Sequence, residues 1–326
     1  MCGLFSKMAQ KIDSIALTTN WPVGPVNVYL IYGEKLTLID TGLKNDQSWK
    51  ELNEALHERG LDIRDIEQII LTHHHSDHAG LLERIIEKNP VPIYAHENAR
   101  PYIERDVAFN QWSKEFFREL FTEFGVSDRL AQRLNHHKKK KLTESSLVLE
   151  KELKEGDGVP GLSSWKVIET KGHSQDHISL YCSDSRVLIC GDHIIKGTPA
   201  GIFLDAPPLG EERAKPLIQY IDNLKKCLHL PVDQTFSGHG PTITNLDDAI
   251  HEQLERIENR ASRVKNILKK HSGTGFEITQ EMYPKRFQQS LGLFVSEITS
   301  VLDLLQQRNE VGAIKKRGKY IYHLLN

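Results

Sequence analysis

Nine consecutive residues, 72–80, constrain this chain more than any other segment, because they read Thr-His-His-His-Ser-Asp-His-Ala-Gly. An apolar run at residues 69–71 precedes them, and residues 81–86 follow with the apolar spacing of a half-buried helix. We therefore expect the histidines on a loop that connects a strand to a helix. On such a loop, side chains can converge without interrupting the hydrogen bonds of a sheet.

The spacing within this motif predicts two pairs of metal ligands. Alternate residues of an extended segment share one face, so His73 and His75 point to one side and His74 to the other. Asp77 and His78 come together where the chain turns into the helix. Imidazole nitrogens combined with a carboxylate oxygen suit zinc, and also iron or manganese.

Four ligands cannot complete two metal sites, so the motif predicts further ligands after later strands. Residues 165–170, 186–190 and 233–236 have strand-like patterns and meet this expectation. Each segment leads into a glycine beside a potential ligand, and glycine permits a tight turn or a close backbone approach. The three pairs are Gly172 with His173, Gly191 with Asp192, and Gly238 with His239.

The chain contains His-x-His-x-Asp-His, Gly-His, Gly-Asp and Gly-His-Gly, in this order. This series resembles the motifs of the metallo-β-lactamase superfamily of hydrolases, and the resemblance covers about residues 14–245. Within the family, the chain looks most similar to the glyoxalase II-like and lactamase-beta-like branch. The resemblance implies an α/β (α+β) fold, an αββα sandwich of two facing sheets with helices outside. The metals would lie at one edge of the sandwich.

The resemblance also implies a role for each ligand, and two Zn²⁺ per chain, with Fe or Mn as alternatives. The first metal would be bound by His73, His75 and His173, the second by Asp77, His78 and His239, and Asp192 would bridge the two. Asp77 and Asp192 are the expected catalytic residues, which hold and orient a bridging hydroxide. Asp40, at the end of an earlier strand, matches a family position that supports a metal ligand from outside the ligand set.

The chain divides into a predicted catalytic domain at 1–245 and a C-terminal domain at 246–326. A helical insertion at about 99–141 carries an aromatic stripe and ends in a basic run, and it is a candidate lid over a substrate pocket. The C-terminal order of helix, helix and basic hairpin resembles the winged-helix module of the lactamase-beta-like branch. Packing against a partner is the favoured role of that module, and nucleic-acid binding is the alternative.

The favoured reaction is hydrolysis of a small thioester or ester, as in hydroxyacylglutathione hydrolases. The alternative is a phosphodiesterase or endoribonuclease that acts on single-stranded RNA. A third possibility is an iron-dependent persulfide dioxygenase, which would use one metal. The net charge of −2 and the aromatic insertion favour a small acyl substrate, and the basic segments favour RNA.

Composition indicates a cytoplasmic enzyme with a small-molecule substrate and no membrane association. The chain has only four cysteines, without paired spacing, as expected in a reducing compartment. No apolar run reaches membrane-spanning length, and residues 1–11 do not have the apolar core of a signal peptide. A homodimer is possible.

Overall fold

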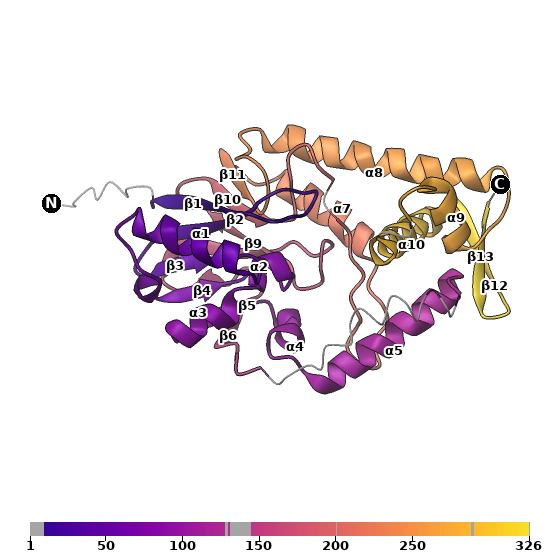
Figure 1. Cartoon of the computed structure of the whole chain (residues 1–326). Helices are drawn as coiled ribbons and strands as arrows, with labels where there is room; N and C mark the ends of the chain where they lie inside the picture. The colour runs from indigo at the N-terminus through magenta and orange to yellow at the C-terminus, as the bar shows by residue number, and fades with distance from the viewer. Residues whose placement is uncertain (1–9, 128–129, 131–144, 200, 288–289, 326) are drawn as a thin grey trace.

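The computed structural model describes residues 10–127, 130, 145–199, 201–287 and 290–325. The predicted basic run at 138–141 and part of the predicted insertion lie outside these ranges. Two β-sheets face each other and helices cover their outer faces, while the C-terminal elements lie at the opposite end of the molecule from the first sheet (Figure 1). This arrangement confirms the predicted αββα sandwich.

The first sheet has six strands in the order of the chain. Its first three strands are antiparallel and the remaining pairs are parallel, so the sheet is mixed, as the alternation of strands and helices predicts. The strands are β1 (Ile12–Leu17), β2 (Val26–Tyr32), β3 (Leu36–Ile39), β4 (Gln68–Ile70), β5 (Ile93–Ala95) and β6 (Lys151–Glu152).

The second sheet has five strands in the order β11-β10-β9-β8-β7. Only β10 and β11 pair in parallel, which brings their carboxyl ends to the same edge. The strands are β7 (Gly158–Val159), β8 (Leu162–Glu169), β9 (Ile178–Cys182), β10 (Val187–Gly191) and β11 (Gln234–Ser237).

Side-chain alternation along β2 explains how the sheets pack. Tyr29 and Ile31 belong to the core between the two sheets, together with Trp165 of β8. Val28 and Leu30 point the other way, to the core under the helices α1 (Asp46–His57) and α3 (Leu82–Lys88). Both faces of this sheet are therefore buried, and only its strand ends are available for a site.

The helical segment that follows the first histidines of the motif is interrupted. It consists of α2 (Ser76–Ala79) and α3, because the backbone N–H of Leu81 donates to the carbonyl of Gly42, 3.1 Å away, and not to the preceding turn. A Cβ at Gly80 would lie 2.4 Å from the backbone nitrogen of Lys44, so only glycine permits this close approach. The break leaves α2 as one turn that carries Asp77 and His78.

The described part of the insertion contains α4 (Arg100–Ile103) and α5 (Val107–Phe124). The far end of α5 contacts the C-terminal helices and hairpin, so Phe121 and Phe124 are core residues there. Trp112, nearer its start, instead lines a cavity. The aromatic stripe therefore has two environments along one helix.

Helices cover the outer face of the second sheet and continue into the C-terminal part. They are α7 (Pro216–Cys227), α8 (Leu246–Leu268), α9 (Gly275–Met282) and α10 (Leu291–Gln307), followed by the hairpin of β12 (Val311–Lys316) and β13 (Lys319–Leu324). Leu188 of β10, Tyr220 of α7 and Ile298 of α10 share one hydrophobic cluster. The boundary at residue 245 therefore crosses a continuous core, and the division into two domains stays a prediction. None of the described helices is both long and apolar enough to cross a lipid bilayer.

Candidate metal centre

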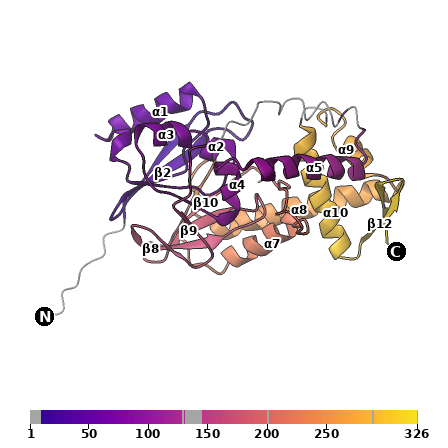
Figure 2. The same ribbon diagram turned by 90° about the horizontal axis from the view of Figure 1, so that it is seen from below.

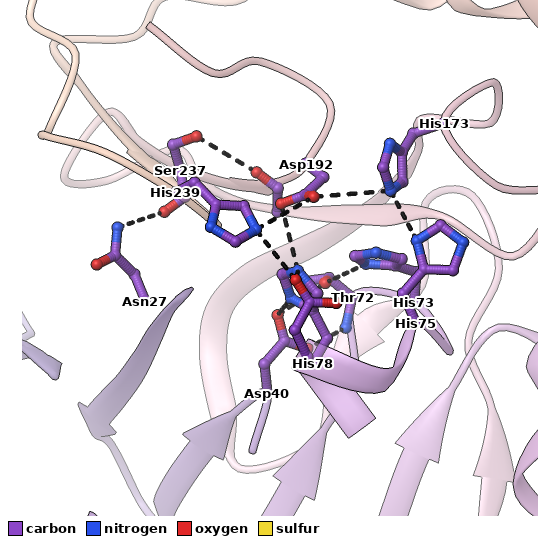
Figure 3. A network of polar contacts seen from close by, with 12 residues as sticks. Asn27, Asp40, Thr72, His73, His75, His78, His173, Asp192, Ser237 and His239 are labelled. Atoms are coloured by element: carbon purple, nitrogen blue, oxygen red, sulfur yellow. Dashed lines mark hydrogen bonds and ion pairs between the residues drawn. The ribbon is translucent and has the colours of Figure 1, made fainter. Parts of the chain in front are cut away.

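The ends of several strands meet at one edge of the sandwich and bring the predicted ligands together (Figure 3). The loop after β4 carries the histidine motif, and the loop between β8 and β9 carries His173. Asp192 directly follows β10, and His239 follows β11. Strand ends are suitable for this purpose because their side chains leave the sheet without breaking its hydrogen bonds.

The first group of potential ligands contains only histidines, and each contributes one ring nitrogen. The ligand atoms of His73, His75 and His173 all lie within 4.8 Å of one another. His75 Nδ1 lies 2.9 Å from His173 Nε2, and the ring centroids of His73 and His75 are 4.6 Å apart. Three imidazoles at this spacing can surround one cation.

The second group contains Asp77, His78 and His239, which the sequence also predicts to act together. His239 Nε2 lies 3.2 Å from Asp77 Oδ2, and His78 Nε2 lies 3.7 Å from the same oxygen. All three residues are buried.

Asp192 lies between the two groups. Its Oδ1 is 3.3 Å from His78 Nε2, while its Oδ2 is 3.5 Å from His239 Nε2 and 3.7 Å from His173 Nε2. One carboxylate therefore faces ligands of both groups, as expected of a residue that bridges two cations.

The polar atoms that face the centre fit a bound metal. The Nε2 atoms of His73, His78 and His239 and Oδ1 of Asp192 are buried, and none makes a hydrogen bond with a described residue. Polar atoms left unpaired in a protein interior are unfavourable, so this set indicates that cations complete it. The arrangement suggests a dinuclear site, and histidine with carboxylate suits zinc, iron or manganese.

The opposite nitrogens of three histidines are held by acceptors outside the centre. Asp40 Oδ2 lies 2.8 Å from His78 Nδ1, the carbonyl of Gly201 lies 2.7 Å from His173 Nδ1, and the carbonyl of Pro25 lies 2.8 Å from His239 Nδ1. These contacts place the proton on Nδ1 and leave Nε2 free for a cation. Asp40 thus contacts a candidate ligand, as its position in the sequence predicts.

Thr72 links Asp40 to a second candidate ligand, a role that the sequence does not predict. Its hydroxyl donates to Asp40 Oδ2 at 2.8 Å and lies 3.0 Å from His73 Nδ1, while its backbone N–H donates to Asp40 Oδ1. Asp40 therefore orients one histidine directly and a second one through Thr72. The only signal in the sequence is that Thr72 is the first residue of the 72–80 motif.

His177 contacts the backbone of Asp192 from outside the ligand set. Its Nδ1 lies 2.8 Å from Thr170 Oγ1, and its Nε2 accepts a hydrogen bond from the backbone N–H of Asp192 at 3.1 Å. Burial, followed by neighbouring histidines, lowers the pKa of His177 well below the usual value. A neutral His177 can accept this bond and so fixes the backbone of Asp192.

His74 faces away from the ligands, as alternation predicts. Its Nδ1 lies 2.8 Å from Asp176 Oδ1, and its ring stacks on Tyr102 with centroids 3.6 Å apart. Burial opposes its protonation, but Asp176 outweighs burial and raises the pKa of His74. His193, which the sequence places outside the ligand set, is also buried and contacts Tyr220.

The histidines of the two ligand groups differ in their charge. Burial and then the neighbouring imidazoles lower the pKa of His73 and His75 well below the usual value, so both are neutral. Burial would also lower the pKa of His239, but Asp192 and Asp77 outweigh it and raise that pKa to about 9. The carboxylates of the second group therefore attract positive charge, which a proton or a cation can supply.

Comparison with known proteins agrees with this geometry. A family model described as the metallo-beta-lactamase superfamily matches residues 21–239. The probable metallo-hydrolase YqjP of Bacillus subtilis (strain 168) is 33% identical over 308 residues, which cover 93% of this chain and 94% of that protein. A hydroxyacylglutathione hydrolase of Idiomarina loihiensis is 26% identical over 239 residues, which cover 72% of this chain and 68% of that protein.

A solved structure extends the likeness to nearly the whole chain. The metallo-beta-lactamase family protein TTHA1429 from Thermus thermophilus superposes with a TM-score of 0.78 at 23% identity, over 96% of this chain and 98% of that one. At this identity the likeness concerns the fold alone. Together with the family match and the histidine and aspartate cluster at the sheet edge, it shows that this chain is a metallo-hydrolase that belongs to the metallo-β-lactamase superfamily.

Proposed function

We propose that this protein hydrolyses a small thioester or ester with the aid of two metal ions, with zinc as the favoured metal. The observation that carries the proposal is the position of Asp192 between two three-residue groups, with buried and unpaired Nε2 atoms on His73, His78 and His239. A hydroxyacylglutathione hydrolase among the relatives supports an acyl substrate.

The proposed roles follow the two groups. His73, His75 and His173 would hold one cation, Asp77, His78 and His239 the other, and Asp192 both. When bound, such cations lower the pKa of water toward neutrality and polarise a substrate oxygen. Asp77 and Asp192 would orient the attacking water, because both carboxylates face the centre. Asp40 keeps His78 in the required tautomer.

A cysteine nucleophile does not fit the described residues. Cys182, Cys190 and Cys227 are buried, and burial raises the pKa of both Cys190 and Cys227 to about 12. These thiols are therefore protonated at neutral pH and shielded from substrate. Buried, unpaired cysteines also support the proposal of a cytoplasmic enzyme.

RNA hydrolysis is the second candidate, and the hairpin of β12 and β13 favours it. Its exposed tip carries Lys315, Lys316, Arg317 and Lys319. Lys315 pairs with Glu123 of α5 at 2.5 Å, which reduces the charge available for phosphates. The order of α9, α10 and this hairpin supports a winged-helix module that packs on α5.

A substrate panel separates these functions. Acyl-glutathione, acyl-CoA and uncharged thioesters would be compared with bis(p-nitrophenyl) phosphate and a labelled single-stranded RNA, on wild type and Asp77→Ala. We expect thioester or ester turnover that is lost in the variant. RNA cleavage lost in Asp77→Ala, steeply weakened by salt and without thioesterase activity, would establish the second candidate instead. One bound iron with dioxygen consumed on a persulfide would establish the dioxygenase.

A further inference from the structure

A cavity of about 770 Å³ lies beside the metal centre, and no candidate metal ligand lines it. One wall comes from residues 97–112, at the start of the insertion, and the other from residues 205–214. Figure 2 shows α4 next to the start of α5. The inner wall contains Gln175 and Asp176, from the loop that also carries His173.

One layer of side chains separates this cavity from the first ligand group. Asp176 binds His74, which lies between the ligands His73 and His75 in the chain. Phe203 also belongs to this layer. It is two residues before Asp205 of the cavity wall in the sequence, and its ring centroid is 4.8 Å from that of His75. The cavity is therefore next to the metal centre but separated from it, so a substrate that uses both must extend past this layer of side chains.

The cavity wall is strongly acidic. Among the residues that the structure describes, the one basic residue of the wall is Arg100, which is already paired with Glu104 and Glu152. Two carboxylates of the wall are paired with cationic side chains that do not line the cavity, Glu97 with Lys154 and Asp176 with His74. The acidic residues of the wall are Glu97, Asp106, Asp176, Asp205, Glu211 and Glu212.

Aromatic rings line the same cavity. Tyr102 and Phe109 are 5.2 Å apart in an edge-to-face arrangement, and Trp112 donates its indole N–H to the carbonyl of Pro207 at 2.7 Å. That bond fixes the indole ring in the wall. Aromatic faces combined with carboxylates bind ammonium groups, through the ring quadrupole and through charge.

A buried oxygen of the wall has no partner. Asp176 is 1% exposed, and its Oδ2 makes no hydrogen bond with any residue in the described ranges, although its Oδ1 binds His74. A buried carboxylate oxygen without a donor is unfavourable. Because this oxygen is buried, a positive charge in the cavity would compensate it through electrostatic attraction and not through direct contact.

We propose that the cavity binds a positively charged amine at the remote end of the substrate. The enzyme therefore hydrolyses esters or thioesters of amine-bearing molecules in preference to anionic ones such as acyl-glutathione. This proposal rests on the proposed hydrolase function and narrows it. One water adds across the C–S or C–O bond, a carboxylic acid and a thiol or alcohol leave, and the amine is unchanged.

Three thioesters of matched shape test the proposal on the metal-loaded protein. Acetylthiocholine carries a trimethylammonium group, S-(3,3-dimethylbutyl) thioacetate is its uncharged isostere, and S-acetyl-3-mercaptopropionate is anionic. We expect kcat/KM to be at least about tenfold higher for the cation than for its isostere, and lowest for the anion. Equal values for cation and isostere, or a preference for the anion, would overturn the proposal.

A triple variant locates the effect in the cavity. Asp106→Asn with Glu211→Gln and Glu212→Gln removes three exposed charges, and asparagine still caps α5 as Asp106 does through the N–H of Phe109. The preference for the cation should fall to less than about threefold. The matched control Glu115→Gln, on α5 but outside the cavity, should keep it. An unchanged preference in the triple variant would place the amine elsewhere.

Binding without turnover separates this proposal from the hydrolase function. Calorimetry with benzyltrimethylammonium on Asp77→Ala should detect binding that the triple variant weakens. If binding is seen while wild type hydrolyses no thioester, the cavity assignment stands and the hydrolase function fails. If wild type hydrolyses thioesters but binds no ammonium ion and shows no preference, the cavity assignment fails alone.

Discussion

His177 Nε2 accepts a hydrogen bond from the backbone N–H of Asp192 at 3.1 Å. Asp192 is the residue that faces both ligand groups, so this single bond fixes the backbone of the proposed bridging residue. Thr170 orients the histidine from its other side, at 2.8 Å from Nδ1. The position of Asp192 therefore depends on a buried residue that lies outside both ligand groups.

His177→Ala should weaken metal binding about 10- to 100-fold, the usual cost of removing a group that orients a ligand. The affinity would be measured by competition with a chromophoric zinc chelator. His251→Ala, an exposed histidine on α8, serves as the control and should leave the affinity unchanged. Equal affinities in both variants would show that Asp192 holds its position without His177.

Asp192→Ala should lose more metal than Asp40→Ala. Asp192 faces both ligand groups, whereas Asp40 contacts His78 only at the nitrogen that points away from the centre. Elemental analysis of the purified proteins would count the metal ions per chain, with two expected in wild type. The opposite order would contradict the bridging role of Asp192.

Zinc affinity should rise with pH up to about pH 9. The pKa of His239 is raised from 6.5 to about 9, so below that pH a cation must displace its proton. In the metal-free protein, protonated His239 stabilises the folded state. This contribution to the free energy of unfolding is complete below pH 6.5 and is lost as the pH rises to about 9. Chelator competition and thermal unfolding across this range would check both trends. A pH-independent affinity would mean that no proton leaves His239.

Metal removal should abolish activity and lower the unfolding temperature. Binding to the folded state alone stabilises it by about 2.7 kcal/mol when the free metal is about 100 times the dissociation constant. Calorimetric unfolding before and after chelation, followed by zinc addition, measures the difference. Chelated protein that retains both its activity and its unfolding temperature would contradict a metal-dependent site.

Gly172→Ala should destabilise the fold and displace His173. Gly172 has φ 136°, and a Cβ there would lie 2.6 Å from Cα of Tyr220. The cost should reach about 1–3 kcal/mol or more, because the backbone of α7 cannot move aside easily. Gly158→Ala, where a Cβ meets nothing within 4 Å, is the matched control for urea unfolding. Equal unfolding midpoints would show that the loop absorbs the change.

Several strands and the candidate ligands could be predicted from the sequence, because apolar side chains recur at regular intervals along strands and helices. The strand-like patterns at 186–190 and 233–236 match β10 (Val187–Gly191) and β11 (Gln234–Ser237) to within one residue at each end. The candidate ligands also follow directly from strand ends, since a strand must stop where its side chains turn to a site. The break in the helix at Gly80 could not be foreseen, because it depends on a hydrogen bond to Gly42, far back in the chain.

The sequence by itself determined the types of ligand, their order and the side of the strand from which each leaves, because alternation is a local property. Only the tertiary structure decided which nitrogen of each histidine faces the centre. That choice depends on acceptors distant in the chain, such as Pro25 for His239. The acidic cavity likewise depends on the tertiary structure. Its walls come from segments about a hundred residues apart in the sequence, which meet only when both sheets have formed.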